Sequence, residues 1–105
     1  MRLFVYGELC KPAVLQAVLG RVPAAEPALL RDYHRSLNRA SRYFRALPLA
    51  GGRVAGLLLE DIDERDLREL DRFENVGGGE YTRVAVDIET LGEGRVLRAW
   101  VYAAG

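Results

Sequence analysis

A single carboxylate in an apolar position is the residue of this sequence best placed to do chemistry. Leu67, Leu70 and Glu74 follow one another at i, i+3 and i+7 of a predicted helix, so all three lie on one face. The two leucines are the residues that such a helix buries. A carboxyl group at the end of this face is partly withdrawn from water, which raises its pKa and makes it a better base. The same spacing also allows Glu74 to leave the last turn for solvent, or to pair with an arginine.

The second informative segment follows the first predicted strand and reads Tyr6-Gly7-Glu8-Leu9. A glycine at a strand end lets the backbone come close to a ligand. The amides after it, with a helix N-terminus near Pro12, are able to hold an anion or an oxyanion. The segment is not a dinucleotide fingerprint, because no third glycine opens the helix. A plain strand-end glycine explains the same residues, and both interpretations stay open at this point.

Cys10 and His34 are the only cysteine and the only histidine of the chain. An internal disulfide and a Cys/His zinc cluster are therefore excluded, and we expect no metal site. Cys10 lies just before a predicted helix, where the helix dipole lowers the pKa of a thiol. A Cys/His nucleophile pair is one interpretation, and a small buried cysteine is the other.

A group of arginines lies around two aromatic residues, Tyr43 and Phe44, in a pattern that can contact nucleic acid. The group consists of Arg35, Arg39, Arg42 and Arg45. The chain has 15 basic and 15 acidic residues and no net charge, so we expect these arginines mostly to meet the chain's own acids, or to help bind an acidic substrate. Neither nucleic acid nor a membrane is an expected partner: no apolar run approaches the ~20 residues of a membrane span. The N-terminus lacks a signal-peptide pattern, and a cytoplasmic protein is expected.

The elements that position these residues follow from apolar spacing and from glycine and proline. A strand is predicted at residues 3–6, a helix from Pro12 to a stop at Gly20, and a second helix from the N-cap Asp63 to about Asn75. Strands are predicted at 54–60, 81–91 and 96–102, the last two as a hairpin. Residues 23–49 predict an irregular strand pair or a loop, and residues 51–52 predict a turn. The fold class is α+β, with a mixed sheet curled toward a barrel and two flanking helices.

Several of these segments together resemble a known family. The segment Leu3-Phe4-Val5-Tyr6-Gly7-x-Leu9 resembles the opening of the gamma-glutamylcyclotransferase-like superfamily, also described as avirulence-induced-gene-like, which typically reads Tyr-Gly-(Thr or Ser)-Leu. Further family-like segments follow in the same order along the chain: Gly56-Leu57-Leu58-Leu59-Glu60, Leu70-Asp71-Arg72-Phe73-Glu74, Tyr81-Thr82-Arg83-Val84-Ala85-Val86 and Ala99-Trp100-Val101-Tyr102. The resemblance implies one gamma-glutamylcyclotransferase-like domain over residues 1–105, with a pocket at one end of a small barrel.

The resemblance also implies an activity. Family enzymes release 5-oxoproline from gamma-glutamyl amides by intramolecular attack of the substrate's α-amino group, and they need no cofactor. Glu74 matches the family's catalytic glutamate, and Tyr6, Gly7, Glu8 and Leu9 match its substrate-binding loop. Tyr81 is expected to complete the pocket wall. Arg83 is expected to pair with an acid or to fix its strand, without a catalytic role.

One departure from the family pattern concerns position 8, where Glu8 replaces a small hydroxyl residue. An inward Glu8 side chain repels a substrate carboxylate and crowds the pocket, whereas an outward one leaves only the backbone amide to act. The alternative to an enzyme is a non-catalytic module that binds a small molecule or a protein on the same fold. The two differ at Glu74, which an enzyme needs inside the pocket. The sequence leaves the amine portion of the substrate and the oligomeric state open.

Overall fold

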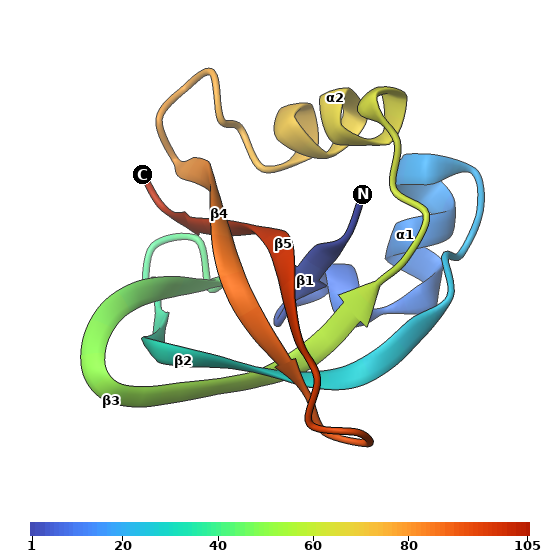
Figure 1. The fold of residues 1–105 in the computed structure, drawn as a ribbon. Helices are drawn as coiled ribbons and strands as arrows, with labels where there is room; N and C mark the ends of the chain where they lie inside the picture. The colour runs from blue at the N-terminus through green and yellow to red at the C-terminus, as the bar shows by residue number, and fades with distance from the viewer.

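The computed structural model describes residues 1–105 as a closed five-stranded barrel with two helices packed against one side (Figure 1). In chain order the elements are β1 (Leu3–Val5), the 3-10 turn η1 (Glu8–Cys10), α1 (Pro12–Leu19), β2 (Ala25–Leu37), β3 (Phe44–Leu59), α2 (Glu64–Phe73), β4 (Tyr81–Thr90) and β5 (Val96–Ala104). The strand order is β1-β3-β2-β4-β5, and the barrel closes where β1 pairs in parallel with β5. The predicted fold class is confirmed. Neither helix has the length and the apolar character needed to cross a membrane.

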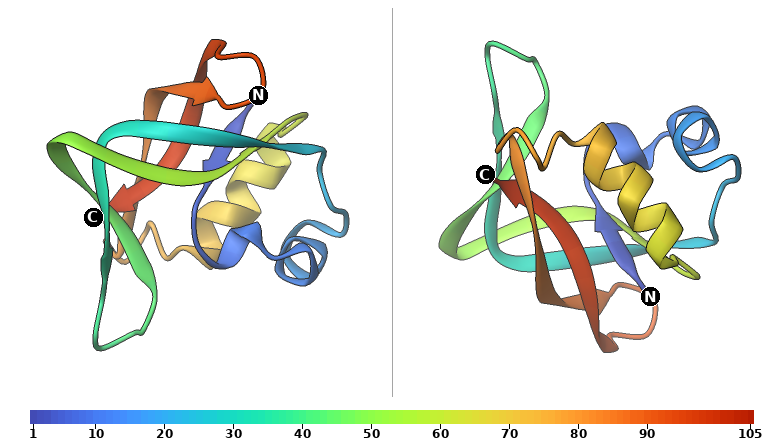
Figure 2. Two further views of the ribbon diagram at one scale, coloured as in Figure 1. Left: turned by 90° about the horizontal axis from the view of Figure 1, so that it is seen from below. Right: turned by 90° about the horizontal axis from the view of Figure 1, so that it is seen from above.

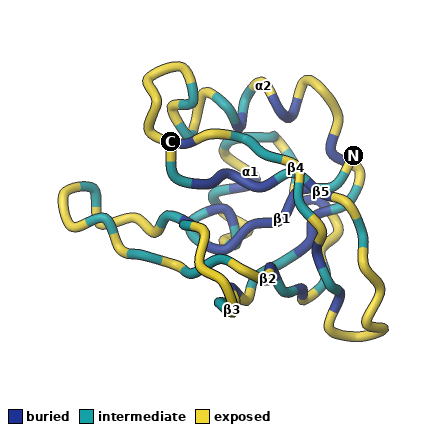
Figure 3. The backbone as a smooth tube through the Cα atoms, turned by 60° about the vertical axis from the view of Figure 1, so that its left-hand side comes forward, coloured by how far each residue is buried: buried dark blue, intermediate teal, exposed yellow.

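Strand β1 lies between two hydrophobic cores because its side chains alternate. Leu3 and Val5 face the core beneath the helices, whereas Phe4 and the following Tyr6 face the barrel interior. All four are buried, and Figure 3 shows this stretch as a buried segment near the middle of the molecule. The loop that starts at Tyr6 is therefore anchored by a strand that is buried on both faces.

Strand β3 passes so close to β1 that one position admits only glycine. A Cβ atom at Gly56 would lie 2.1 Å from the carbonyl oxygen of Val5 and 2.8 Å from the ring of Phe4. Real Cβ atoms do not approach backbone this closely, so any other residue forces the two strands apart. This contact fixes the end of β1 against β3, directly before the loop at residues 6–9.

The hairpin formed by β2 and β3 corrects the sequence-based prediction. Gly51 and Gly52 do not make a turn, because they lie inside β3 opposite a register shift at Asp32. Asp32 and Gly51 both adopt positive φ, 65° and 79°, and the amide of Gly51 donates to the Asp32 carboxylate at 3.0 Å. The chain reverses at residues 38–43 instead, and Figure 2 shows this tip projecting beyond the barrel. Residues 23–49, predicted as an irregular strand pair or a loop, thus belong largely to one long, bulged hairpin.

Helix α2 begins as predicted and ends slightly earlier than predicted. The Asp63 carboxylate accepts from the amide of Asp66 at 2.8 Å, and the Asp66 carboxylate accepts from the amide of Asp63 at 3.1 Å, which forms a capping box. The last helical residue is Phe73, and Glu74 is the C-cap. Asn75 has a φ of 52°, which turns the chain out of the helix at once.

Candidate active site

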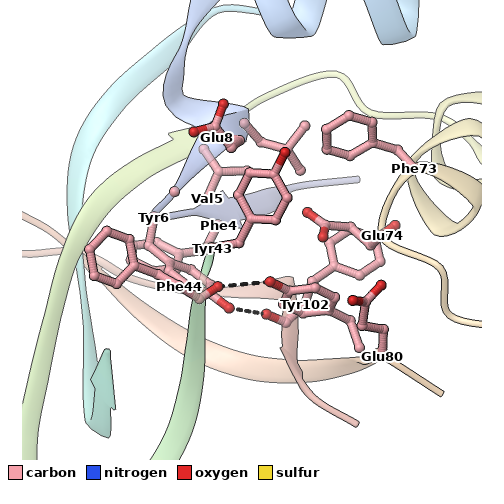
Figure 4. Close-up of a pocket in the computed structure, with 13 residues that line it drawn as sticks. Phe4, Val5, Tyr6, Glu8, Tyr43, Phe44, Phe73, Glu74, Glu80 and Tyr102 are labelled. Atoms are coloured by element: carbon pink, nitrogen blue, oxygen red, sulfur yellow. Dashed lines mark hydrogen bonds between the residues drawn. The ribbon is translucent and has the colours of Figure 1, made fainter. Parts of the chain in front are cut away.

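The ends of several strands surround a cavity of about 170 Å³ at one end of the barrel. Its lining comes from β1, η1, the beginning of β3, the end of α2, the beginning of β4 and the end of β5 (Figure 4). The lining residues are Phe4, Val5, Tyr6, Gly7, Glu8, Leu9, Tyr43, Phe44, Phe73, Glu74, Glu80, Tyr81 and Tyr102. The structure therefore brings together around one cavity the six residues that the family resemblance assigned to the site, which are Tyr6, Gly7, Glu8, Leu9, Glu74 and Tyr81.

Glu74 is a half-buried carboxyl group that has no bonded partner in the protein. Its carboxylate points into the cavity (Figure 4), and no hydrogen bond or ion pair reaches it, so the arginine pairing allowed by the sequence is not formed. Burial, and after it the negative charge of Glu80, raises the pKa of Glu74 from 4.5 to about 7. Near neutral pH such a group takes up and releases a proton readily, as a general acid/base must.

Two tyrosine hydroxyls in the wall of the cavity hold its frame together. The hydroxyl of Tyr6 donates to the carbonyl oxygen of Tyr102 and accepts from the amide of Ala46 at 2.9 Å, which connects β3 to β5. The hydroxyl of Tyr81 donates to the carbonyl oxygen of Phe44 at 2.8 Å. Burial raises the pKa of Tyr81 to about 12 and that of Tyr6 further still. Both side chains therefore stay neutral, and both hydroxyls are used in hydrogen bonds to the backbone of the cavity wall.

A charged cluster one turn before Glu74 ties α2 to the barrel. Arg83 donates to both carboxylate oxygens of Asp71, at 2.9 Å and 3.2 Å, and the hydroxyl of Tyr102 donates to the same carboxylate at 2.7 Å. Burial opposes ionisation of Asp71, but the hydrogen bonds from Arg83 and Tyr102 prevail and lower its pKa. The guanidinium of Arg83 also lies over Trp100, 4.5 Å from the ring centre. Arg83 thus pairs with an acid, as the sequence analysis expected.

The loop opposite Glu74 offers backbone donors. The amides of Gly7, Glu8 and Leu9 donate to no acceptor in the protein, as is usual at the start of a helical turn. The Glu8 carboxylate accepts from Lys11 Nζ at 2.9 Å and 3.1 Å, and Figure 4 shows it turned away from Glu74. Of the two directions considered for this side chain, the structure has the outward one. Residues 7–9 therefore line the cavity, while the Glu8 carboxylate is held by Lys11.

Of the two interpretations of Cys10, the Cys/His nucleophile pair is contradicted by the structure. Burial raises the pKa of the Cys10 thiol, and the opposing effect of Arg35 is smaller. No hydrogen bond joins Cys10 to His34. The thiol also lies outside the lining of the cavity. The pair therefore lacks the contact and the thiolate character that a Cys/His nucleophile needs.

The expectation that the arginines of the β2–β3 hairpin meet the chain's own acids is also wrong. None of Arg35, Arg39, Arg42 and Arg45 forms an ion pair, although nine other ion pairs are present in the structure. Balanced total charge does not predict which charges meet. These four residues leave the hairpin beside the cavity strongly basic.

Sequence reasoning did not assign several residues to the cavity wall. Phe73 and Glu80 are direct neighbours of residues that it did assign, so proximity in the chain was an available signal. Tyr43 and Phe44 were noted only as aromatic partners of the arginines, because nothing local shows that the hairpin folds back over the cavity. Tyr102 was noted only as part of the last strand.

A closed five-stranded barrel with two helices on one side is the fold of gamma-glutamylcyclotransferase-like proteins. Residues 3–105 match the family model described as gamma-glutamyl cyclotransferase, AIG2-like, and the chain belongs to this family. AIG2-like protein C of Arabidopsis thaliana is 36% identical over 100 residues, which are 95% of this chain and 56% of that protein. A gamma-glutamylcyclotransferase and putative RNase of Methanocaldococcus jannaschii is 28% identical over 74 residues, 70% of this chain and 33% of that protein.

Solved structures agree with the fold. The solution structure of an Arabidopsis thaliana protein superimposes with a TM-score of 0.87 at 29% identity, over 98% of this chain and 67% of that one. A structure described as a gamma-glutamyl cyclotransferase superimposes with a TM-score of 0.83 at 18% identity, over 100% of this chain and 66% of that one, and at this identity it shows the fold alone. The chain spans just over half the length of the Arabidopsis relative, 56%.

Proposed function

We propose that this protein releases 5-oxoproline and a free amine from a gamma-glutamyl amide, with Glu74 as the general acid/base. One observation carries the proposal. An unpaired, half-buried carboxyl group with a pKa of about 7 lies across a small cavity from loop amides that have no acceptor in the protein. Membership of the cyclotransferase-like family supports the same reaction class.

The chemistry balances with protein groups and substrate alone. The ionised Glu74 takes a proton from the substrate's α-ammonium group, and the free amine then attacks the γ-carbonyl carbon. A new carbon–nitrogen bond closes the five-membered ring, and the oxyanion formed on attack accepts from the amides of the loop at residues 7–9. When this intermediate collapses, the original amide bond breaks and the leaving amine takes the proton from Glu74. The ring nitrogen still carries one proton more than the lactam product holds, and the newly ionised Glu74 takes this proton and passes it to the released amine, which departs as an ammonium ion.

The protein supplies little besides position and proton transfer, because the nucleophile is already tethered to the electrophile. Well-oriented intramolecular attack is worth ~7–11 kcal/mol. A cofactor is not required by this scheme. A carboxyl pKa of about 7 suits a group that must act first as a base and then as an acid at neutral pH. The outward Glu8 carboxylate supports the proposal, because it does not oppose a substrate anion at the loop.

The test is release of 5-oxoproline from a panel of gamma-glutamyl amides by the parent and by Glu74→Gln. Loss of general acid/base catalysis costs ~10²–10⁴-fold in rate, so we expect kcat/KM to fall by at least about a hundredfold. The matched control Glu93→Gln changes an exposed carboxylate in the distant β4–β5 turn and keeps the parental rate. No release from any amide, or undiminished release by Glu74→Gln, overturns the proposal. Binding of the amides without turnover then favours the non-catalytic module.

A further inference from the structure

The end of the β2–β3 hairpin is a basic surface whose charge has no part in the proposed reaction. It comprises residues 35–45, and Figure 2 shows it projecting beyond the barrel, where a partner can reach it. No aspartate or glutamate occurs from residue 33 to residue 59, and none of the arginines of the hairpin end forms an ion pair. The chain therefore does not neutralise the positive charge of this end.

Three arginines and a tyrosine make up what we call the hairpin patch: Arg35, Arg39, Arg42 and Tyr43. Arg35, Arg42 and Tyr43 line one groove beside the cavity, and Arg39 lies in the turn between the strands. All four side chains are exposed. The only carboxylate that lines the groove, Glu8, is bound by Lys11 at 2.9 Å and 3.1 Å, so it does not reduce the charge of the patch.

The fourth arginine of the hairpin end is not part of the patch. Arg45 lies opposite Ser36 in the register of the two strands, whereas Phe44 lies opposite Leu37. Because neighbouring residues of a strand point to opposite faces, Arg45 leaves the face of the hairpin opposite to that of Phe44. A ligand on the patch therefore meets the three arginines named above.

Arg42 adopts a backbone conformation that arginine rarely takes. Its φ is 64°, and the other non-glycine residues with positive φ are Asp32, Asp61 and Asn75. Aspartate and asparagine tolerate this region better than other residues with a Cβ atom, and glycine tolerates it best. No hydrogen bond or ion pair of the Arg42 side chain offsets the strain within the protein. Strained residues of this kind gather at functional sites, which makes Arg42 a candidate for a contact outside the protein.

Hydrogen bonds hold the turn that carries the patch in one shape. The carbonyl oxygen of Asn38 accepts from the amide of Arg42 at 2.7 Å, and its side-chain oxygen accepts from the amides of Ala40 and Ser41 at 3.0 Å and 3.4 Å. The amide of Tyr43 donates to the Ser41 hydroxyl at 3.3 Å. A preformed turn of this kind reduces the ordering that binding would otherwise require.

Arg35 is also held in place, although it has no acidic partner. Its Nη1 donates to the carbonyl oxygen of Tyr6 at 3.3 Å, and its guanidinium lies 4.1 Å from the centre of the Phe44 ring. The remaining N–H groups of its planar fork are free to donate. Such a fork matches two oxygens of a phosphate.

The aromatic residue of the patch decides which class of polyanion fits it. The side chain of Tyr43 is 52% exposed, beside an arginine with no acidic partner. Unpaired bases stack on exposed aromatic rings while arginines contact the phosphates between them. The bases of a duplex are stacked on one another, and an acidic peptide has carboxylates but no bases to stack. A single strand of nucleic acid uses both the charge and the ring.

We propose that the hairpin patch binds single-stranded nucleic acid, with the three arginines on the phosphates and a base stacked on Tyr43. The expectation that nucleic acid is not a partner depended on balanced total charge and on arginines that meet the chain's own acids, and these arginines meet none. The inference goes beyond the proposed function and does not depend on it, because binding is measured without turnover.

The test is fluorescence anisotropy of labelled oligouridylate and oligothymidylate of about ten nucleotides, a length within the ~4–16 nucleotides that small single-strand-binding folds cover. The parent protein is titrated at several salt concentrations. Three phosphate contacts at about −0.7 each predict a slope of about −2 for the logarithm of the association constant against the logarithm of salt concentration. Tighter binding of the uridylate identifies RNA as the ligand, and tighter binding of the thymidylate identifies DNA.

Variants locate the binding on the patch. Tyr43→Ala removes the stacking surface and is expected to weaken binding about tenfold. Arg42→Gly removes one phosphate contact and is expected to weaken binding and to reduce the salt slope by about 0.7. Because glycine adopts the positive φ without strain, this variant keeps or raises the Tm, which excludes unfolding as the cause of weaker binding. Arg68→Gln, at an exposed and unpaired arginine of α2 outside the cavity and the groove, keeps the parental affinity and slope.

Three results overturn the inference. Absence of salt-dependent binding of both oligomers to the parent removes it outright. Binding that Tyr43→Ala and Arg42→Gly leave unchanged places the nucleic acid on another surface. Displacement of the oligomers by an oligoglutamate of equal length at equal concentration means that the patch reads negative charge alone, as a surface for acidic proteins does. None of these results bears on the release of 5-oxoproline, so the inference and the proposed function fail or stand separately.

Discussion

Replacing Glu74 with glutamine is expected to stabilise the folded protein at alkaline pH, because the cavity disfavours the ionised carboxyl group. Burial and the neighbouring Glu80 raise the pKa of Glu74 from 4.5 to about 7. A pKa difference of about 2.5, at about 1.36 kcal/mol for each pKa unit, corresponds to about 3 kcal/mol of unfolding free energy. Because water reaches the half-buried carboxylate and partly solvates its charge, this free energy is an upper value.

The sign of the effect follows from the two states of the chain. Below the unfolded-state pKa of 4.5, Glu74 is protonated whether the protein is folded or unfolded, and it adds no pH dependence. Between 4.5 and about 7 the unfolded chain has lost the proton while the folded one keeps it, so the stability of the parent falls as pH rises. Above about 7 the full penalty is present and constant. Glutamine has the shape of the protonated acid and does not ionise, so the variant lacks this loss.

Urea denaturation of the parent and of Glu74→Gln, at about pH 4 and about pH 8.5, measures the effect. We expect nearly equal stability at the lower pH, and a variant that is more stable by up to about 3 kcal/mol at the higher pH. Glu93→Gln, at an exposed ion pair, is the control and is expected to differ from the parent by less than about 1 kcal/mol at both pH values. A stability difference for Glu74→Gln that is the same at both pH values refutes the argument that the cavity holds this carboxyl group away from water.

Other substitutions test the frame of the site. Tyr6→Phe leaves a buried backbone amide of β3 without its acceptor, and urea denaturation is expected to show a loss of about 1–3 kcal/mol. Gly56→Ala places a Cβ atom 2.1 Å from a β1 carbonyl oxygen and is expected to lower the Tm strongly or prevent folding, whereas Gly77→Ala, with open space around it, leaves the Tm nearly unchanged. Asp71→Asn is expected to cost about 2 kcal/mol near neutral pH. Because the folded-state pKa of Asp71 lies below 3.8, this difference shrinks as the pH falls below that value, which denaturation at several acid pH values will show.

Local sequence signals were sufficient to predict both helices and the β4–β5 hairpin. A proline at the start of α1, the capping box of α2 and the alternation in β4 and β5 are each complete within a few residues, and the corresponding elements are present. The β2–β3 hairpin was different. Gly51-Gly52 has the local signature of a turn, but pairing with Asp32, far away in the sequence, converts it into a bulge inside a strand. Only the partner strand decides between these two outcomes.

The same distinction explains which parts of the site were predictable. Glu74 and the loop at residues 6–9 stand next to strong local signals, so spacing and resemblance place them on the correct elements. Tyr43 and Phe44 reach the cavity only because the long hairpin bends over the end of the barrel. The arginines beside them stay unpaired for the same reason, since their surroundings depend on where the hairpin comes to lie rather than on the total charge of the chain.

Burial is the largest cause of the raised pKa of Glu74, and no cation near the carboxyl group offsets it. A carboxylate at the C-terminal end of a helix meets the negative end of the helix dipole, so its ionised form needs a nearby cation. The arginine on the adjacent strand, Arg83, is already bound through two hydrogen bonds by Asp71, one turn earlier on the same helix. The unpaired arginines lie on the hairpin, beyond the opposite wall. Because Arg83 is bound by Asp71, Glu74 has no counter-charge. Its carboxyl group therefore exchanges a proton at neutral pH.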